Sequence, residues 1–340
     1  MFLNNSNGVI EGERMAETTN ERVIYRYGSV PHSTSILEPR VWCLAWRHDG
    51  RILATCGDNK FIQAEVTELN TISGDHSRTV RYVEFSRSGG FLACASFDST
   101  ITIYKQTDSD LDEVYKLEGH QNEVKCCTFS ASDEFLASCG RDKTVWIWQM
   151  NDDDYEVRCI LQNHTADVKF VAWHPSEDIF VSGGYDSSLL FYKFDYEDFV
   201  VDQYVSNAHD DTIWSGAFSA SGEYLATCGA DYFVNIWKHN LGEHVDESWS
   251  FVAEYKFNET RWPLYSVAWN PEHSNFIALG GADYFLRILR FDPENKALSV
   301  FAQLRLDAEI NCVRWNPRFS NIVAAACDDG LAHFIRVDLP

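Results

Sequence analysis

The sequence predicts an all-β protein, a propeller of seven blades. Seven apolar segments end in an aromatic residue, at Trp46, Phe85, Phe129, Trp173, Phe218, Trp269 and Trp315. Each segment is followed by a polar turn, a second apolar segment and an aspartate: Asp58, Asp98, Asp142, Asp186, Asp231, Asp283 and Asp329. A repeat of about 40–45 residues that holds several short strands is typical of propellers and not of helical or leucine-rich solenoids.

The segments inside each unit have the composition of strands. TVRYVEFS, FLACASF and STITIY are rich in β-branched and aromatic residues and are separated by turn residues, which favours four strands per unit. The seventh unit ends after its third strand, GLAHFIRV. We therefore expect RVIYRYGSV, residues 22 to 30, to supply the outer strand and close the ring. Residues 1–21 are predicted to be a flexible extension, and residues 22–340 one propeller.

Composition limits the classes of partner. The net charge of −23 repels phosphate backbones and anionic lipid, so direct binding to nucleic acid or to a membrane is not expected. The sequence has no apolar run of 18 residues and no secretory signal, so the expected location is the cytoplasm, with the nucleus left open. The ten cysteines form no Cys-x-x-Cys pair and fall mostly in apolar segments, so we expect buried free thiols, no metal site and no cofactor.

The third unit, residues 118–148, resembles the WD repeat. In that family a His before the first strand, a Ser or Thr in the second, the turn Asp and a Trp in the third strand form this network. The matching residues are His120, Ser138, Asp142 and Trp148 in the third unit, His164, Ser182 and Asp186 with Tyr192 in the fourth, and His209, Thr227, Asp231 and Trp237 in the fifth. The sixth and seventh units keep the Asp and lose the His.

A Ser, a His and an Asp could also activate a nucleophile. The same trio recurs at equivalent places in three successive units, whereas an active site is needed once. We therefore interpret the trios as structural and expect no catalytic residue.

One rim of the predicted propeller carries the candidate binding residues. In WD propellers the loop before the first strand and the turn with the Asp share this rim, called the top. The third residue of each first strand should surround the channel mouth there: Trp42, Arg81, Lys125, Lys169, Trp214, Tyr265 and Asn311. Arg141 and Tyr185 stand directly before a turn Asp. A mouth of basic and aromatic residues would suit a short acidic peptide, or one with a C-terminal carboxylate and an aromatic anchor. The alternative is that the three cations only pair with neighbouring acids.

The opposite rim should be acidic. The third-to-fourth-strand connections at 106–113, 151–156, 195–202 and 243–247 contain 15 acidic residues and neither Lys nor Arg. They could dock a basic partner, although charge runs are usually solvated faces.

The succession of units is similar to one branch of the WD proteins, the cytosolic iron–sulfur protein assembly component. The segments that carry this resemblance are LEGHQNEVK (117–125), GRDKTVWIW (140–148), NHTADVKFVAWHPS (163–176), TIWSGAF (212–218) and SGEYLATCGAD (221–231). The resemblance implies a non-catalytic subunit of the targeting complex that brings iron–sulfur clusters to cytosolic and nuclear apoproteins. It implies a small cysteine-bearing partner, a large helical-repeat adaptor and short C-terminal client peptides as binding partners. It also places the family's functional exposed arginine at Arg141, with Gly140 in place of a Ser.

The sequence leaves open a cochaperone contact and the choice among rival functions. Some family members have Leu-Tyr-Arg, a proposed cochaperone contact, where this chain has Phe191-Tyr192-Lys193, and the sequence does not say whether a cochaperone binds here. The rival functions are a generic WD adaptor, such as a ubiquitin-ligase substrate receptor or a chromatin-complex subunit, and an enzyme built on a propeller. The enzyme has no lone, unsymmetrical polar cluster to support it.

Overall fold

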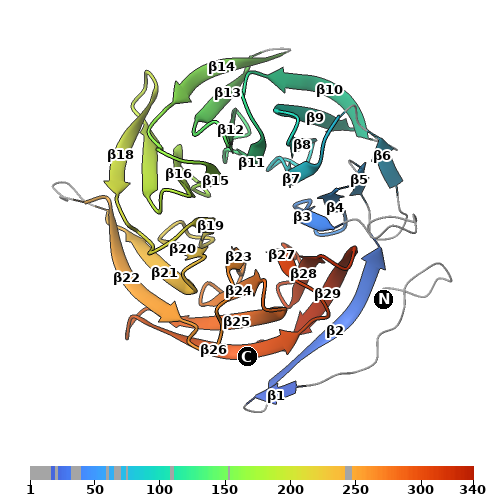
Figure 1. The fold of residues 1–340 in the computed structure, drawn as a ribbon, viewed down its shortest axis with the longest axis vertical. Helices are drawn as coiled ribbons and strands as arrows, with labels where there is room; N and C mark the ends of the chain where they lie inside the picture. The colour runs from blue at the N-terminus through green and yellow to red at the C-terminus, as the bar shows by residue number, and fades with distance from the viewer. Residues whose placement is uncertain are drawn as a thin grey trace.

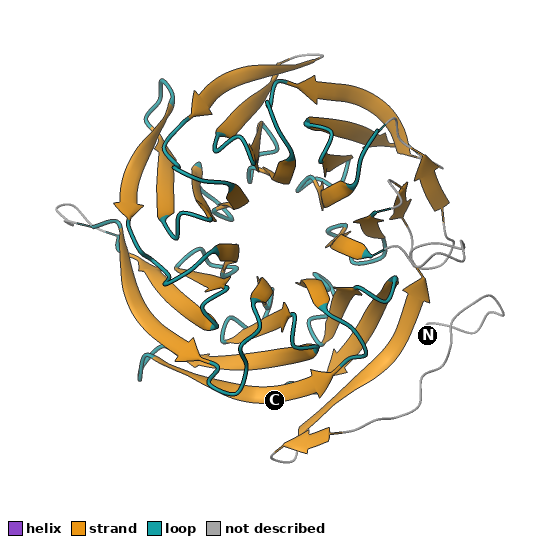
Figure 2. Cartoon of the chain, viewed as in Figure 1, coloured by secondary structure: helices purple, strands orange, loops and turns teal. Residues whose placement is uncertain are grey.

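The strands form a ring of sheets around a central channel (Figure 1). The computed structural model describes residues 17–19, 22–31, 40–58, 61–64, 70–73, 76–107, 111–151, 154–241 and 247–340. Strands and loops account for all of these residues (Figure 2). Within the described ranges no helix is long and apolar enough to cross a membrane.

Six sheets are blades of four consecutive antiparallel strands. Blade 1 contains β3 (Val41–Trp46), β4 (Leu53–Gly57), β5 (Phe61–Ala64) and β6 (Asn70–Ser73), and blade 2 contains β7 (Val80–Phe85), β8 (Phe91–Ser96), β9 (Thr100–Gln106) and β10 (Leu111–Glu118). Blade 3 contains β11 (Val124–Phe129), β12 (Phe135–Gly140), β13 (Val145–Asn151) and β14 (Asp154–Leu161), and blade 4 contains β15 (Val168–Trp173), β16 (Ile179–Gly184), β17 (Leu189–Phe194) and β18 (Phe199–Val205). Blade 5 contains β19 (Ile213–Phe218), β20 (Tyr224–Gly229), β21 (Phe233–His239) and β22 (Trp249–Lys256), and blade 6 contains β23 (Leu264–Trp269), β24 (Phe276–Gly281), β25 (Phe285–Asp292) and β26 (Ala297–Arg305).

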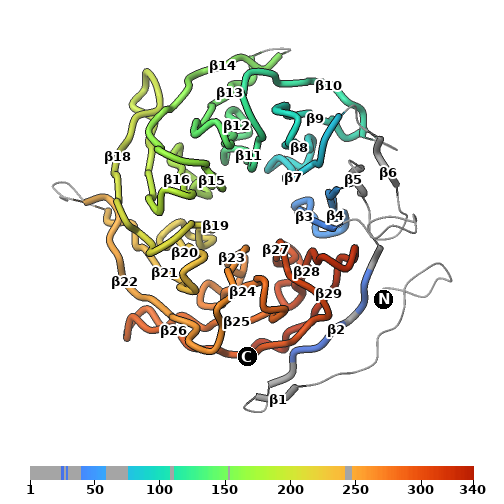
Figure 3. Tube along the Cα trace, viewed as in Figure 1, coloured from blue at the N-terminus to red at the C-terminus, as the bar shows by residue number. Residues whose placement is uncertain are grey.

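The remaining sheet is composite, because its strands come from both ends of the chain. It has five strands in the order β1 (Glu17–Thr19), β2 (Arg22–Pro31), β29 (Leu331–Val337), β28 (Ile322–Cys327) and β27 (Ile310–Trp315). Figure 3 follows the chain once around the ring, from β3 to β29, which lies beside β2. We predicted seven blades, the seventh closed by an N-terminal strand; the structure has six four-stranded blades of consecutive strands and one five-stranded composite sheet. The last sheet differs because the chain ends after its third strand and an N-terminal strand completes it.

The predicted N-terminal strand is present and pairs along β29, from Ile24 opposite Val337 to Pro31 opposite Leu331. Ile24 is fully buried among Ile335, Val337 and their neighbours, so the strand adds apolar core as well as hydrogen bonds. Glu17–Thr19, which we assigned to a flexible extension, form the strand β1 on the outer edge of β2. Residues 1–16, 20 and 21 lie outside the described residues.

The core lies between neighbouring blades. Phe135 of blade 3 stacks with Trp173 of blade 4, with ring centroids 6.3 Å apart, and Trp46 of blade 1 contacts Phe334 of the composite sheet at 5.8 Å. Alternating side chains of each strand therefore bury against the next blade, as expected for sheets packed face to face.

Thiols and hydroxyls on the inner strands join one blade to the next. The Cys126 thiol donates to the Val171 carbonyl of the next inner strand at 3.6 Å, and Ser266 Oγ accepts the backbone N–H of Val313 at 3.1 Å. Nine of the ten cysteines are buried, as the sequence predicts, and Cys159 is half-buried. Burial raises the pKa of the Cys43 thiol to about 12, so this group stays protonated at neutral pH.

Candidate functional site

The third blade brings His120, Ser138, Asp142 and Trp148 into one chain of hydrogen bonds. Trp148 Nε1 donates to Ser138 Oγ at 2.9 Å, and Ser138 Oγ lies 2.8 Å from His120 Nε2. His120 Nδ1 lies 2.7 Å from Asp142 Oδ2. Because the Asp142 carboxylate only accepts hydrogen bonds, His120 Nδ1 carries the hydrogen. His120 Nε2 therefore accepts the hydrogen bond from the Ser138 hydroxyl, and each of the four side chains has a hydrogen-bond partner.

Blades 4 and 5 repeat this arrangement. His164 bridges Asp186 at 2.9 Å and Ser182 at 2.7 Å, and His209 bridges Asp231 at 2.9 Å and Thr227 at 2.8 Å. Trp237 closes the chain in blade 5 by donating to Thr227 Oγ1 at 3.1 Å. In blade 4 Tyr192 takes the place of the Trp and stacks on Phe180 at 4.5 Å.

Three related pairs were missed by the sequence analysis. In blade 2 His76 Nδ1 lies 3.0 Å from Asp98, and the signal was present as His-Ser-Arg-Thr-Val, with the His four residues before the first Val as in blade 3. Blade 6 has Thr260 at the His position, and there Arg287 of β25 binds Asp283 at 3.1 and 2.6 Å. In the composite sheet His333 of β29 lies 2.8 Å from Asp329. An Arg or a His on the third strand thus replaces the missing His as the partner of the turn aspartate.

The pKa of each network aspartate follows from these bonds. Burial alone would raise the pKa of the Asp142 carboxyl, but the hydrogen bonds from His120 and Thr144 outweigh it and hold the pKa below its ordinary value. The pKa values of Asp98, Asp186 and Asp231 are lowered in the same way by their histidines. These carboxylates are charged at neutral pH, and their charge is part of the folded state.

Replacing Asp142 by Ala should lower the free energy of unfolding by about 1–3 kcal/mol, because buried donors lose their acceptor. Urea unfolding at pH 7 measures this change. Asp112→Ala is the matched control, since Asp112 lies exposed on the outer strand of blade 2. Equal stabilities of the two variants would contradict a structural role for Asp142.

Acid should remove the contribution that Asp142 makes to the free energy of unfolding of the wild-type protein. Because the folded-state pKa values lie below the unfolded value of about 4, the stabilisation is complete at neutral pH and is lost as pH falls through the folded-state values. The difference in unfolding free energy between wild type and Asp142→Asn should therefore shrink as pH falls from 6 to 3. A difference that is constant with pH would show that the Asp142 charge does not matter.

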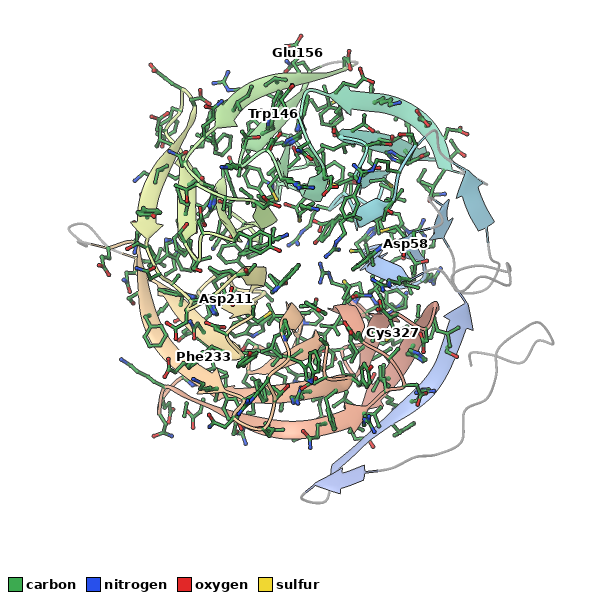
Figure 4. The ribbon with its side chains drawn as sticks, viewed as in Figure 1. Asp58, Trp146, Glu156, Asp211, Phe233 and Cys327 are labelled. Carbon is green, nitrogen blue, oxygen red and sulfur yellow. The ribbon has the colours of Figure 1, made fainter. Side chains whose placement is uncertain are left out.

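On the top rim, Trp42 and Arg81 meet between blades 1 and 2. Trp42 Nε1 donates to Asp58 Oδ1 at 2.6 Å, which fixes the indole. The Arg81 guanidinium lies 5.0 Å from the centroid of the Trp42 ring, within the range of a cation–π contact. Figure 4 shows Asp58 near the inner strands, in contrast with Glu156 on the outer rim.

Glu123 gathers three cations between blades 2 and 3. Lys125 Nζ lies 2.6 Å from Glu123 Oε2, Arg78 Nη2 lies 2.8 Å from Oε1, and Arg141 Nη1 lies 3.6 Å from Oε1. Burial would raise the pKa of Glu123, but the bonds from Lys125 and Arg78 lower it. One carboxylate cannot neutralise three cations, and the side chains of Arg78 and Arg141 are 53% and 55% exposed. Arg78 was not predicted from the sequence.

Lys169 lies against aromatic rings between blades 4 and 5. Its Nζ is 4.0 Å from the Tyr185 ring centroid and 4.9 Å from that of Trp214. The Asp167 carboxylate is 4.0 Å away, beyond hydrogen-bond distance. Burial, together with the charge of Lys125, lowers the pKa of Lys169 to about 8.

The aromatic side of the mouth continues into blade 6. Trp214 and Tyr265 meet edge to face at 5.2 Å, and Tyr185 is 49% exposed beside them. Asn311, the last member of the predicted ring, is buried and bonds to the Val41 carbonyl at 3.0 Å and Asp328 at 2.7 Å, so it belongs to the frame. Trp262, in the loop before β23, is 60% exposed on this rim. The sequence signal for Trp262 was Arg-Trp-Pro at residues 261–263. These residues stand where other blades have the residues that follow the His.

All three predicted mouth cations contact an aromatic face. Lys125 Nζ lies 4.0 Å from the Phe97 ring centroid and also binds Glu123, which it shares with two arginines, and Lys169 and Arg81 lie against Tyr185 and Trp42. The alternative that these cations only pair with neighbouring acids therefore does not describe their contacts. Positive charge and aromatic rings therefore lie side by side at the channel mouth, on a rim that also carries the turn aspartates and on a chain that is acidic as a whole.

The acidic connections are described only in part. Residues 108–110, 152, 153 and 242–246 lie outside the described residues. In the turn between β17 and β18, Asp195 Oδ1 accepts the backbone N–H groups of Glu197 and Asp198 at 3.1 and 2.9 Å. These contacts stabilise the turn.

Two clusters have the residue types of a metal site. His174, Glu177 and His239 lie together, but His174 Nδ1 accepts the N–H of Glu177 at 3.1 Å, so Nε2 carries the hydrogen and offers no lone pair. Cys327, Asp329 and His333 form the second cluster, where His333 already binds Asp329 and burial raises the pKa of the thiol. Neither set fits a metal ion.

The lower half of the channel holds a cavity of about 530 Å³. On one side Arg314 Nη2 donates to the Tyr82 hydroxyl at 2.7 Å, and that hydroxyl lies 3.4 Å from Glu84. Burial raises the pKa of Glu84 to about 7, although Arg314 lowers it. The rest of the lining mixes alanines with aromatic and polar side chains from several blades, among them Ala172, Trp173 and His174.

Four-stranded blades built on repeated His–Asp turns define a WD-repeat β-propeller protein. The family model described as WD domain, G-beta repeat matches residues 31–63, 67–105, 111–149, 155–193 and 202–238. The chain is 45% identical over 320 residues to the probable cytosolic iron-sulfur protein assembly protein CIAO1 homolog of Caenorhabditis elegans, a match that covers 88% of this chain and 95% of that protein. The chain belongs to this family of cytosolic iron–sulfur protein assembly proteins.

Other relatives have related names. The probable CIAO1 homolog of Schistosoma japonicum is 39% identical over 233 residues, which is 65% of this chain and 66% of that protein. Protein CIA1 of Arabidopsis thaliana is 39% identical over 95 residues, which is 24% of this chain and 27% of that protein. The family assignment favours iron–sulfur protein assembly over a generic WD adaptor.

Proposed function

We propose that this chain is a non-catalytic scaffold that joins iron–sulfur assembly factors to apoprotein clients for late cluster insertion, in the cytoplasm and for nuclear proteins. Membership of the assembly family and the cationic, aromatic mouth support this function. The His–Ser–Asp arrangement recurs in equivalent places and each Ser or Thr hydroxyl is buried, which suits a structural network and gives a substrate no access. A negatively charged body also argues against direct contact with nucleic acid or membrane.

The composite sheet acts in this proposal as the seventh blade. It supplies an inner strand, β27, that contacts β3 of blade 1 and closes the circle. The described residues from Arg22 onward then form one platform, to which β1 adds an edge strand.

The mouth is the proposed partner-binding site. Its proposed residues are Arg141, Arg81, Lys125, Lys169, Trp214, Tyr265, Trp42 and Tyr185, and we add Arg78 and Trp262 because both are exposed on the same rim. Arginine guanidinium groups can bind a carboxylate through two hydrogen bonds, and exposed Trp and Tyr give large contact area. The ligand that fits best is a short acidic client segment with an aromatic residue and a free C-terminal carboxylate.

The other proposed partners are a small cysteine-bearing assembly factor and a large helical-repeat adaptor. A cochaperone contact at Phe191-Tyr192-Lys193 is not part of the proposal, because Phe191 and Tyr192 are fully buried. Lys193 is exposed but binds Asp202 at 2.5 Å.

Affinity purification of the tagged full chain tests the pathway. Recovery of iron–sulfur assembly factors and iron–sulfur enzymes would support the proposal. Recovery of ubiquitin-ligase or histone-modifying subunits in their place would support the generic adaptor and overturn it.

A fluorescent ten-residue peptide tests the site. The peptide carries two acidic residues and a C-terminal aromatic residue with a free carboxylate, and its control has the same sequence with an amidated C-terminus. We expect the free acid to bind about tenfold more tightly, since it keeps a charge-assisted bond worth roughly 1.5–3 kcal/mol. Equal affinities would exclude carboxylate recognition.

A further inference from the structure

Lys125 and Lys169 have equivalent positions on the inner strands of blades 3 and 4, but their ammonium groups have different surroundings. Lys125 is hydrogen-bonded to Glu123 at 2.6 Å. Both amines lie against aromatic faces, Lys125 over Phe97 and Lys169 over Tyr185 and Trp214. Lys169 has only a long ion pair with Asp167, at 4.0 Å. Among the residues that the structure describes, no acid is hydrogen-bonded to Lys169, and this is where the two lysines differ.

This difference affects reactivity, because an amine is a nucleophile only when it is unprotonated. A lysine with the ordinary pKa of about 10.4 is neutral in roughly one molecule per thousand at pH 7.4. Burial and the neighbouring Lys125 lower the pKa of Lys169 to about 8, so a much larger fraction of this amine is neutral at that pH. Burial lowers the pKa of Lys125 as well, but there the hydrogen bond to Glu123 opposes it. The Lys169 side chain keeps 9% of its surface exposed at the mouth.

We propose that Lys169 is a modification site, where the amine at the channel mouth takes an acyl group from thioester donors and thereby loses its charge. The chemistry needs no other reactant. The lone pair of Nζ attacks the thioester carbonyl carbon, the C–S bond breaks, and the thiolate leaves with the bonding electrons. The thiolate takes the proton that nitrogen loses, and the products are an amide and a thiol.

The surroundings of Lys169 suit the product. The amide is uncharged and planar, so it can stay against the faces of Tyr185 and Trp214 without the cost of burying a charge. The effect on partner binding rests on the proposed function, because it assumes that the mouth charge attracts an acidic segment. The acylation of Lys169 itself does not rest on the proposed function.

The first experiment incubates the full chain with acetyl-CoA at pH 7.4 and measures acetylation of each lysine by peptide mass spectrometry. We expect Lys169 to react at least about tenfold faster than Lys125 and the exposed Lys105, with a midpoint near pH 8 in its rate profile. Tyr185→Glu should slow acetylation of Lys169 relative to Tyr185→Gln, because it adds a carboxylate partner that holds the proton. Equal rates at Lys169 and Lys105 would overturn the proposal.

The second experiment measures binding of the acidic fluorescent peptide before and after acetylation. Treatment should weaken binding about tenfold in wild type and have no further effect in Lys169→Arg, which cannot be acetylated there. Rapid acetylation of Lys169 without any loss of binding would reject the mouth as the peptide site while keeping the modification site. An unreactive Lys169, in a protein whose mouth still binds the peptide, would reject the modification alone.

Discussion

Charge reversal at Lys125 and Lys169 should abolish partner capture while the protein stays folded. Each lysine is expected to meet a carboxylate of the client, and a hydrogen bond to a charged group contributes roughly 1.5–3 kcal/mol. Loss of two such contacts corresponds to at least about a hundredfold weaker binding. Fluorescence anisotropy with the acidic peptide measures the loss, and thermal melting reports whether the variant is folded.

The control for this experiment must change the net charge equally. Lys105→Glu with Lys116→Glu does so on exposed strand positions of blade 2, away from the mouth. Because Lys125→Glu would stand beside Glu123, the pair Lys125→Met and Lys169→Met is a second variant that removes charge without adding repulsion. Undiminished binding by both mouth variants would disprove the site. Equal losses in the Lys105 and Lys116 control would show only a long-range effect of charge.

Removing residues 1–30 should destabilise the fold severely, whereas removing residues 1–20 should change it little. The longer truncation removes nearly all of β2, its pairing with β29, and the fully buried Ile24. Loss of one buried Ile side chain alone costs about 2–5 kcal/mol, and β29 would become an open edge. The shorter truncation removes only β1 from the ring of strands. Urea unfolding of the two truncated proteins measures the difference.

A point variant separates the role of β2 from chain length. Ile24→Ala in the full chain should lose about 2–5 kcal/mol of stability, and Ser29→Ala, on the same strand but half-buried, should lose much less. If the two truncations unfold at the same urea concentration, β2 does not close the propeller.

The predictions from the sequence agree best with the structure where the position of a side chain follows from the repeat alone. The His, Ser or Thr, Asp and Trp of blades 3 and 5 are spaced by the repeat, so once each blade forms, these side chains must meet. Arg287 and His333 were not predicted as substitutes for the missing His. Both lie four residues after their Asp, on the third strand, and only the folded sheet shows that the strand carries them back to the same carboxylate.

At the channel mouth, too, the sequence gives the position of a side chain but not its contacts with other blades. The sequence places Lys125 and Lys169 at equivalent positions with equal charge. Their different surroundings depend on Glu123, Tyr185 and Trp214. Tyr185 belongs to another loop of blade 4, and Trp214 belongs to blade 5.

By itself, the sequence determined the all-β propeller, the order of its strands, the turn aspartates, the buried thiols and the N-terminal closing strand. These follow from local periodicity and composition, which each strand carries in its own residues. Only the tertiary structure decided that β1 adds a fifth strand to the last sheet, that one glutamate is shared by three cations, and that Lys169 lies between aromatic rings without a hydrogen-bonded acid. Those features depend on distances between blades, and such distances are set when the whole ring packs and closes.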